Sequence, residues 1–340
     1  MIFNNDKKGA EELKALLGFI YKSNSFANMI SFIGFAERDI RKVIGNPVFD
    51  FAQEHYLSEN YQLEEPNEAH PEYIILDELV HSVQLPVALH AYRRYAPNND
   101  LTHSDSGRSI IVTETEKPAF EWMIDKSDKS LLDLAHEATD ILLEFLDKNV
   151  DYTLDGDDEP LIPWGTSEEF NVSRELFITK DQFNDEFFID GSRRVFLALT
   201  PSIRKVQENE VLSCLGKDKY DEISEQIIDD DVSDENNTLL MLIRPALTFL
   251  SLSKAVISLS IEILPNGIFS NFITGTINSK NAAAASQRIE ISKSLLQQGR
   301  QELTALQEKI TRAATEAEGN TYSAEDPTER IDPEKLYVRI

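Results

Sequence analysis

Short segments from the first half of this chain recur in the second half, in the same order and at nearly the same spacing. The tetrapeptide IRKV stands at 40–43 and at 203–206, an offset of 163 residues, and KSLL stands at 129–132 and at 293–296, an offset of 164. The turn sequences DSG and PNG match at an offset of 160. One such match is expected by chance, but three in the same order are not. The pattern therefore predicts a tandem duplication of a unit of about 160 residues.

The order of the expected elements agrees with a duplication. Each half reads as apolar-faced helices, an acidic loop, a long helix, a β-hairpin and a further long helix. The hairpins are expected near 99–114, around the turn at 105–107, and near 261–276, around Asn266-Gly267. The predicted fold class is mainly α with small β-hairpins, an α+β class.

Composition changes along the chain suggest the domain boundaries. We expect a first helical unit at 1–150 and a second at 171–318. Residues 151–170 are polar and rich in turn residues, so they are the expected linker. Residues 319–340 contain two prolines and many charges, which predicts an extended C-terminal tail.

Charge and apolar content exclude several classes of function. The net charge of −27 disfavours non-specific binding of nucleic acid through a basic patch. The most apolar run, 239–264, is interrupted by Arg244, Lys254 and Glu262, so we expect a buried helix and a strand there and no membrane segment. Cys214 is the single cysteine, which excludes intramolecular disulfides, and its apolar neighbours predict an inert buried thiol.

Residues that could carry catalysis or bind a metal do not form a recognisable site. His136 and Asp140 lie one helical turn apart, but such a pair without a third ligand is more often a surface hydrogen bond. The acidic segments 155–160 and 229–236 lack the ligand order of a calcium loop. Nucleotide-binding and hydrolase motifs are absent from the sequence. We therefore expect no enzyme activity and no catalytic, cofactor or metal site.

Three segments carry a resemblance to a known family: AEELKALLGFI at 10–20, LTHSDSGRSIIVTETEKPAFEWMID at 101–125 and LPNGIFSNFITGTINSKNAAAAS at 264–286. The chain resembles an uncharacterised family of structural proteins from phages and prophages of Bacteroides-type bacteria. Similar proteins of crAss-like phages are ring or connector proteins of the head-to-tail junction. The resemblance implies a virion protein, assembled in the bacterial host cytoplasm, and it implies no catalytic residues.

This resemblance sets the expected partners. It implies a homo-oligomeric ring of about 12 copies that contacts the portal and neighbouring tail or connector proteins. DNA would pass through an acidic lumen without specific binding, and no membrane is involved. The expected interface residues are four cations and three tail residues: Arg41, Lys42, Arg204, Lys205, Leu336, Tyr337 and Val338. Two alternatives remain open, another capsid- or tail-associated structural protein and a prophage-encoded cytoplasmic binding or regulatory protein.

Overall fold

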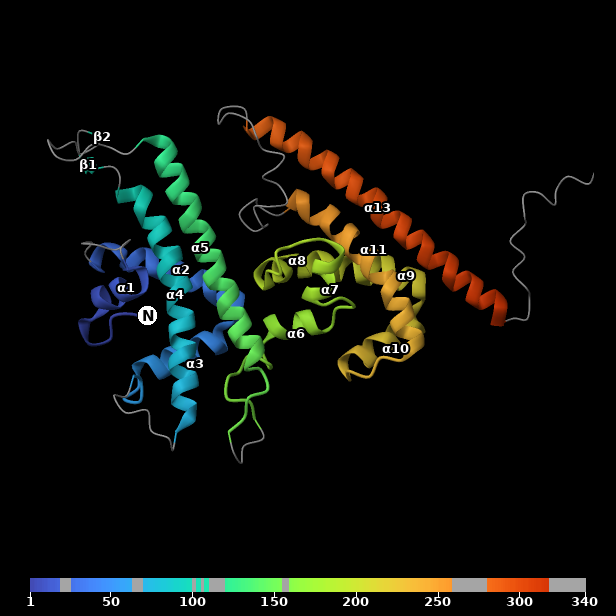
Figure 1. Cartoon of the computed structure of the whole chain (residues 1–340), viewed down its shortest axis with the longest axis horizontal. Coiled ribbons are helices and arrows are strands. Elements are labelled where there is room, and N and C mark those ends of the chain that lie inside the picture. Colours follow the sequence, from blue (N-terminus) through green and yellow to red (C-terminus); the bar gives the residue numbers. More distant parts are fainter. Residues whose placement is uncertain are drawn as a thin grey trace, which may run out of the picture. The chain divides into compact units, whose positions relative to one another are not determined.

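The chain folds mainly into helices, which confirms the mainly α class expected from the sequence (Figure 1). The computed structural model describes residues 1–18, 26–62, 70–99, 102–104, 107–109, 120–154, 159–258 and 280–317. These residues divide into two compact units. Unit 1 comprises the described residues of Met1–Glu175 together with Ile189–Thr200, and unit 2 comprises those of Leu176–Phe188, Pro201–Ser260 and Ser270–Ile340.

Unit 1 is a bundle of helices around a single apolar core. Its elements are a 3-10 turn (Asn5–Lys7), α1 (Gly9–Leu17), α2 (Phe26–Ile44), α3 (Asn46–Leu57), α4 (Pro71–Asn99), α5 (Glu121–Lys148) and α6 (Glu168–Arg174). The helix α4 packs against α1, α2, α3 and α5, and it runs beside α5 in Figure 1. Leu79, Val83 and Ala88 are among its fully buried side chains, and burial around much of its circumference marks it as the central helix of the core.

A glycine forms the sharp turn between α2 and α3. Gly45 has φ +81°, a conformation that residues with a Cβ rarely adopt. A Cβ at this position would lie 2.6 Å from a carboxylate oxygen of Glu169, a flexible side chain that can move, so the backbone conformation is what requires glycine. Pro47 follows in the first turn of α3, where its fixed φ suits a helix and its missing N–H leaves no hydrogen bond unmade.

Unit 2 is built around a second pair of long helices. Its elements are α7 (Lys180–Glu186), the C-terminal part of α8 (Arg193–Val206), a π-helical turn (Gln207–Val211), α9 (Leu212–Leu215), α10 (Lys217–Ile228), α11 (Asp234–Ser258) and α13 (Lys280–Ala317). The division between the units falls inside α8, after Thr200. Thr179 begins α7 with a capping box, in which its hydroxyl accepts from the Gln182 N–H at 3.3 Å.

The helices α11 and α13 approach each other closely. A Cβ at Gly299 of α13 would lie 2.6 Å from Leu250 Cγ and 2.9 Å from the Leu250 backbone nitrogen, so only glycine fits this crossing. Two helical turns before Gly299 on α13, the Ser292 hydroxyl donates to the Ser253 carbonyl of α11 at 2.8 Å. Among the described helices, one segment, 234–257 of α11, is long and apolar enough to cross a membrane, and 61% of its most apolar window is buried inside the protein. That burial agrees with the expected core helix.

The segment 151–170 differs from the predicted linker. Its described residues pack into unit 1, where Ile162 and Trp164 are buried in the core. The Trp164 indole N–H donates to the Asp147 carboxylate at 2.8 Å, and the Leu161 N–H donates to the Tyr152 carbonyl at 2.8 Å. The turn residues in this segment therefore shape a compact loop, and the buried indole attaches it to the end of α5.

The two expected hairpins and the tail lie in segments that the structure describes only in part or not at all. A two-stranded antiparallel ladder pairs β1 (Thr102–Ser104) with β2 (Gly107–Ser109), and its register places His103 opposite Arg108. The hairpin expected near 261–276 and the tail 319–340 lie outside the described residues.

Candidate functional site

The first predicted pair of interface cations is engaged within unit 1. The Arg41 guanidinium forms an ion pair with Asp50 and lies 4.0 Å from the centre of the Phe49 ring. The Lys42 ammonium lies 3.3 Å from an Asp39 carboxylate oxygen, although the Lys42 side chain remains 68% exposed. Arg41 therefore braces the turn between α2 and α3, and of this pair Lys42 is the cation that a partner could reach.

Of the other predicted interface residues, one is half-buried, one is exposed and three lie outside the described residues. Arg204 is half-buried on α8, near enough to Tyr220 of α10 for its charge to act on the phenol. Burial raises the pKa of Tyr220, and the Arg204 charge opposes that rise. Lys205 is exposed. Leu336, Tyr337 and Val338 lie outside the described residues.

A His–Asp pair within an aromatic cluster lies where the end of α3 meets the start of α4. His55 Nε2 is 2.7 Å from Asp77 Oδ1, and the Gln62 N–H donates to the same carboxylate at 3.2 Å. The His55 ring stacks on Tyr73 at 6.1 Å and meets Tyr61 edge-on at 6.0 Å between ring centres. Burial raises the pKa of Tyr61 to about 12, so the phenol stays protonated.

This arrangement connects elements and does not form an open active site. His55 is 7% exposed, so its ring is enclosed by the aromatic neighbours. Paired with Asp77, it joins α3 to α4, while the Gln62 contact ties down the chain that leaves α3. Buried polar groups with satisfied hydrogen bonds of this kind specify how helices pack.

A second polar cluster brings cationic side chains together where α4, α5 and the start of α8 meet in unit 1. His90 of α4 and His136 of α5 lie with ring centres 6.1 Å apart. The charges of Arg93, Arg94 and Arg194 all act on His90. Two carboxylates partly balance this charge, because Asp39 forms an ion pair with Arg94 and Asp140 lies beside Arg194.

Both imidazoles are neutral at pH 7. Burial, reinforced by Arg93, lowers the pKa of His90 from 6.5 to about 4, and burial together with Arg194 lowers that of His136 to about 3. His90 Nε2 lies 3.3 Å from Thr139 Oγ1, and the Thr139 hydroxyl donates to the Ala135 carbonyl at 2.8 Å. His90 Nε2–H must therefore be the donor, which fixes its tautomer.

Two carboxylates of α5 hold the first turn of α8. Asp140 accepts from the Ser192 hydroxyl at 2.8 Å and from the Arg194 N–H at 2.8 Å, so it caps the N-terminus of α8 from a neighbouring helix. Asp147 accepts from Arg193 Nε at 2.9 Å, in addition to the Trp164 indole. In the described part of the chain, no group of three or more His, Cys, Asp or Glu side chains could hold a metal ion.

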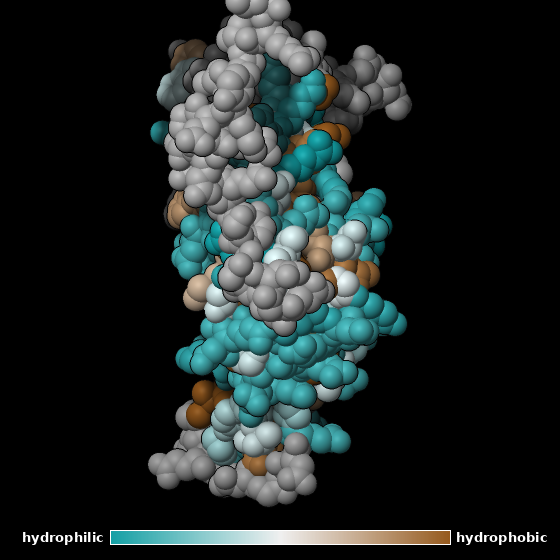
Figure 2. Space-filling view, turned by 90° about the vertical axis from the view of Figure 1, so that its right-hand side faces the viewer, coloured by the Kyte–Doolittle hydropathy of each residue, from teal (hydrophilic) through white to brown (hydrophobic). Residues whose placement is uncertain are grey.

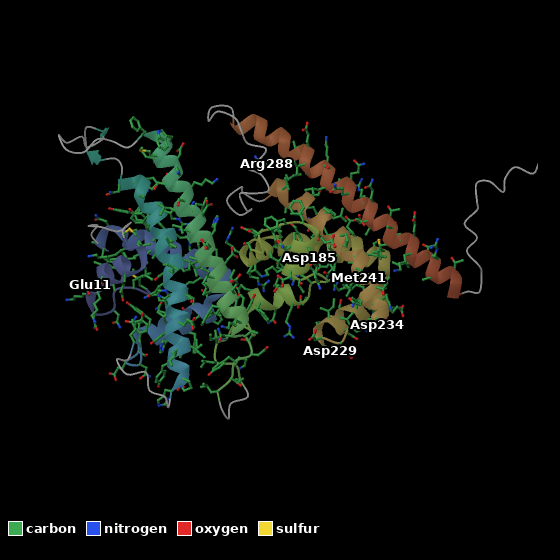
Figure 3. All side chains as sticks on the ribbon, viewed as in Figure 1. Glu11, Asp185, Asp229, Asp234, Met241 and Arg288 are labelled. Atoms are coloured by element: carbon green, nitrogen blue, oxygen red, sulfur yellow. The ribbon has the colours of Figure 1, made fainter. Side chains whose placement is uncertain are left out.

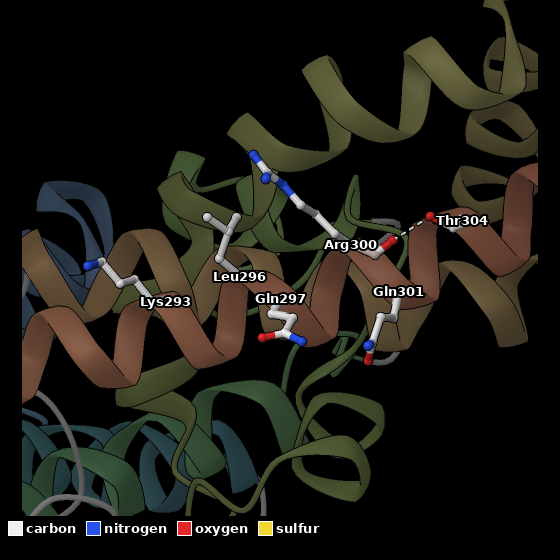
Figure 4. Close-up of a pocket in the computed structure, with 6 residues that line it drawn as sticks. All are labelled: Lys293, Leu296, Gln297, Arg300, Gln301 and Thr304. Carbon is white, nitrogen blue, oxygen red and sulfur yellow. Dashed lines mark hydrogen bonds between the residues drawn. The ribbon is translucent and has the colours of Figure 1, made fainter.

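The surface of α13 carries a hollow that these contacts do not use. Six residues on one side of the helix line it, and its volume is about 310 Å³: Lys293, Leu296, Gln297, Arg300, Gln301 and Thr304 (Figure 4). Leu296 is half-buried and supplies the apolar floor, while Gln297 and Arg300 are exposed. The Thr304 hydroxyl donates to the Arg300 carbonyl at 2.8 Å, so it is satisfied within the helix.

The remaining surface features are charged loops and scattered apolar side chains. Asp229 and Asp234 lie at the α10–α11 end of unit 2, within the acidic loop that the sequence indicated (Figure 3). The face drawn in Figure 2 is mostly hydrophilic, with small separate hydrophobic areas. Such a surface suits a chain with a net charge of −27.

Comparison with known proteins identifies a family without a known activity. The sequence profile of DUF6712, a family of unknown function, matches residues 40–155 and 212–317, well over half of the chain. The chain belongs to this family. No curated protein and no solved structure matches it significantly.

The two DUF6712 segments cover comparable parts of the two units. The first runs from the end of α2 through α3, α4 and α5, and the second runs through α9, α10, α11 and α13. The cluster at His55 lies inside the first segment, as do His90 and His136, whereas Arg194 lies outside both segments. The α13 hollow lies inside the second segment. Membership of DUF6712 assigns no activity to the chain, so its function has to be inferred from its fold and its surface.

Proposed function

We propose that this chain is a structural virion protein, a ring or connector subunit at the phage head-to-tail junction. The observation that supports it best is how the side chains are used. The polar clusters around His55, His90 and Asp147 join helices within unit 1, whereas large apolar side chains stay exposed on helix faces. These exposed residues include Phe35 at 49%, Met241 at 63% and Ile257 at 62%. Exposed apolar residues on rigid helices suit assembly with other subunits.

The same proposal includes the tandem duplication, because repeated units are a common way to build extended interfaces. At an offset of 163, five buried positions of α2 match buried positions in and directly beside α8. They are Met29, Ile33, Ala36, Ile40 and Ile44, opposite Ser192, Phe196, Leu199, Ile203 and Gln207. At an offset of 164, Leu131 and Leu142 of α5 correspond to the buried Leu295 and Leu306 of α13.

The offset between equivalent residues of the two repeats changes from 163 to 171 at the start of α3 and α10, and it returns to 163 at the start of α4 and α11. Gly45 and Gly216, with φ +81° and +75°, precede the equally long helices α3 and α10, and there the offset is 171. The second unit has the extra π-helical turn before its glycine and a shorter loop after α10, so α4 and α11 begin again at an offset of 163. The presence of two DUF6712 segments in one chain is also consistent with a repeat.

The proposed location in a virion has an electrostatic consequence. A ring of chains that each carry −27 would repel a DNA backbone passing through it, so DNA could slide without adhering. In a filter-binding assay at low salt, we expect no retention of double-stranded DNA by the purified protein. Tight, salt-sensitive DNA binding would contradict this part of the proposal.

The deciding experiment is to co-express the full chain with the portal protein from the same genome. We expect native mass spectrometry to find closed homo-oligomers of one defined size and negative-stain images to show them stacked on the portal. A protein that joins tail or capsid assemblies but never the portal would favour the other structural role. A monomer or dimer that joins no virion component would favour the cytoplasmic regulatory role and would overturn the proposal.

A further inference from the structure

We propose that α2 of one copy docks into the α13 hollow of the next copy, head to tail, by repeating between chains a contact that already exists inside unit 1. This inference rests on the duplication and ring assembly given under the proposed function. It specifies which surfaces meet and which residues lie at the centre of the contact.

The contact inside unit 1 joins the outer side of α5 to the start of α8. Asp140 caps the α8 N-terminus, and His136, one turn earlier on α5, lies close enough to Arg194 for the Arg194 charge to lower the pKa of His136. From α8, Arg193 reaches Asp147, and Leu197 packs against the core of unit 1. One side of α5 and residues 193, 194 and 197 of α8 therefore form the two halves of this contact.

The α5 half has an open counterpart on α13. At the offset of 164, His136 and Asp140 correspond to Arg300 and Thr304, which are two of the six residues that line the hollow. The other four correspond to positions on the same side of α5, since 293, 296, 297 and 301 map onto 129, 132, 133 and 137. The hollow thus lies on the face that, in α5, receives a helix.

The α8 half has an open counterpart on α2. At the offset of 163, Arg193, Arg194 and Leu197 correspond to Ile30, Ser31 and Gly34, and all three of these are exposed. A Cβ at Gly34 would meet no atom within 4 Å. Phe35 lies beside Gly34 and is 49% exposed, so this side of α2 is an apolar strip with a small residue at its centre. We call Ile30, Ser31, Gly34 and Phe35 the α2 strip.

The chemistry of the two halves suits contact between copies. The internal contact uses charged groups that stay permanently paired, Asp140 and Asp147 with α8. At the counterpart positions the two aspartates become the neutral Thr304 and Thr311, and the α2 strip offers Ile30 and Phe35. The hollow combines the half-buried Leu296 with two cations, Lys293 and Arg300. An apolar centre with exposed polar edges such as Gln297 is typical of a protein–protein interface.

The strip and the hollow are different surfaces, so each copy uses one of each. Such a heterologous contact produces a ring when its rotation closes and a filament when it does not. Because each copy carries −27, long-range repulsion opposes the contact at low ionic strength. We therefore expect association to strengthen as salt rises from about 10 mM to about 150 mM, over which the Debye length falls from roughly 30 Å to roughly 8 Å.

The test uses one variant for each surface and their mixture. Gly34→Trp places a bulky side chain at the centre of the α2 strip, where a Cβ meets no atom of its own chain. The double variant Gln297→Glu/Arg300→Glu makes the hollow more negative by three charges. By native mass spectrometry and sedimentation velocity at 150 mM salt, the wild type should form higher oligomers and each variant alone should stay monomeric. A mixture of the two should form a 1:1 dimer, because each partner keeps the surface that the other lacks.

Matched controls separate the contact from folding and from net charge. Gln298→Glu/Lys309→Glu makes the same change in charge on another side of α13, and both of these positions are exposed. Ile74→Trp places the same bulky side chain at an exposed position of α4. Both controls should assemble like the wild type, and circular dichroism should show the same helicity for every variant.

The outcomes distinguish this inference from the proposed function. Single-surface variants that assemble like the wild type, or a variant mixture that stays monomeric, would overturn the strip–hollow contact and leave a portal-bound ring possible. A 1:1 dimer in the mixture together with no association with the portal would support the contact and overturn the connector role. A wild type that remains monomeric at all salt concentrations would overturn the contact.

Discussion

The close crossing of α11 and α13 predicts that one substitution, glycine to alanine, has opposite effects at two helical sites. At Gly299 the new Cβ would lie 2.6 Å from Leu250 Cγ, about 1 Å inside normal carbon–carbon contact. The Leu250 backbone nitrogen, at 2.9 Å, means that the α11 backbone also has to move. At Gly34 the Cβ meets nothing within 4 Å.

The magnitudes follow from two general effects. Alanine in a helix interior is favoured over glycine by about 1 kcal/mol at either site. Overpacking costs about 1–3 kcal/mol, and it applies only at Gly299. We therefore expect Gly34→Ala to raise the free energy of unfolding by up to about 1 kcal/mol. The difference between the two variants should equal the overpacking cost, about 1–3 kcal/mol, because the helix propensity cancels.

The assay is urea unfolding followed by circular dichroism at 222 nm, at a protein concentration low enough to keep every variant monomeric. Two compact units can unfold separately, so the transition that involves α13 has to be assigned first. If Gly299→Ala is stabilised as much as Gly34→Ala, α11 and α13 do not approach as closely as described, and the reasoning fails.

Two further predictions concern the polar clusters of unit 1. The pKa of His90 is about 4 in the folded chain and 6.5 in the unfolded chain, so the unfolded chain binds the proton first as the pH falls. The free energy of unfolding should therefore decrease by about 3 kcal/mol between about pH 6.5 and about pH 4. A pH series of urea midpoints should lose this part of the slope in His90→Gln, while the exposed control His81→Gln should keep it; equal slopes in both would contradict the burial of His90. Asp147→Ala leaves the buried Arg193 without its carboxylate and should lower the unfolding free energy by about 3 kcal/mol, with Trp164 fluorescence as the reporter. Unchanged stability and fluorescence would show that Asp147 does not anchor this loop.

The sequence predicted the helical class and the register of the last helix because those depend on regular spacing. KSLL and the apolar positions after it place Leu295 and Leu306 on one face, and both are buried in the structure. The equivalence of Gly45 and Gly216, where the offset between the two repeats changes, was not predicted from the sequence. It could have been found from a pattern that both repeats share, a glycine followed by a twelve-residue helix.

The linker prediction at 151–170 was wrong because composition weighs all polar residues alike. A single indole, Trp164, together with one carboxylate on α5, attaches that loop to the core. Likewise, the sequence offered no means of seeing that Arg41 would meet Asp50 across the Gly45 turn. Contacts between residues far apart in the chain depend on how helices meet, and local spacing does not encode that.

The candidate surfaces were only partly accessible to sequence reasoning. Charge suggested Lys42 and Lys205, and both are exposed. The α2 strip and the α13 hollow, which contains the cations Lys293 and Arg300, follow from the burial of equivalent positions in the fold and have no distinctive sequence motif. His136 and Asp140, expected from the sequence to form a surface hydrogen bond, both face α8 in the contact between α5 and α8.

The position of Cys214 makes the thiol a built-in labelling site in unit 2. It is half-buried on α9, and the Gln307 amide of α13 donates to its sulfur at 3.3 Å. Burial raises the pKa of the thiol, which slows its reaction, while its partial exposure keeps it accessible. Because the chain has one cysteine, a maleimide dye would label α9 beside α13 at a single position, without an engineered site.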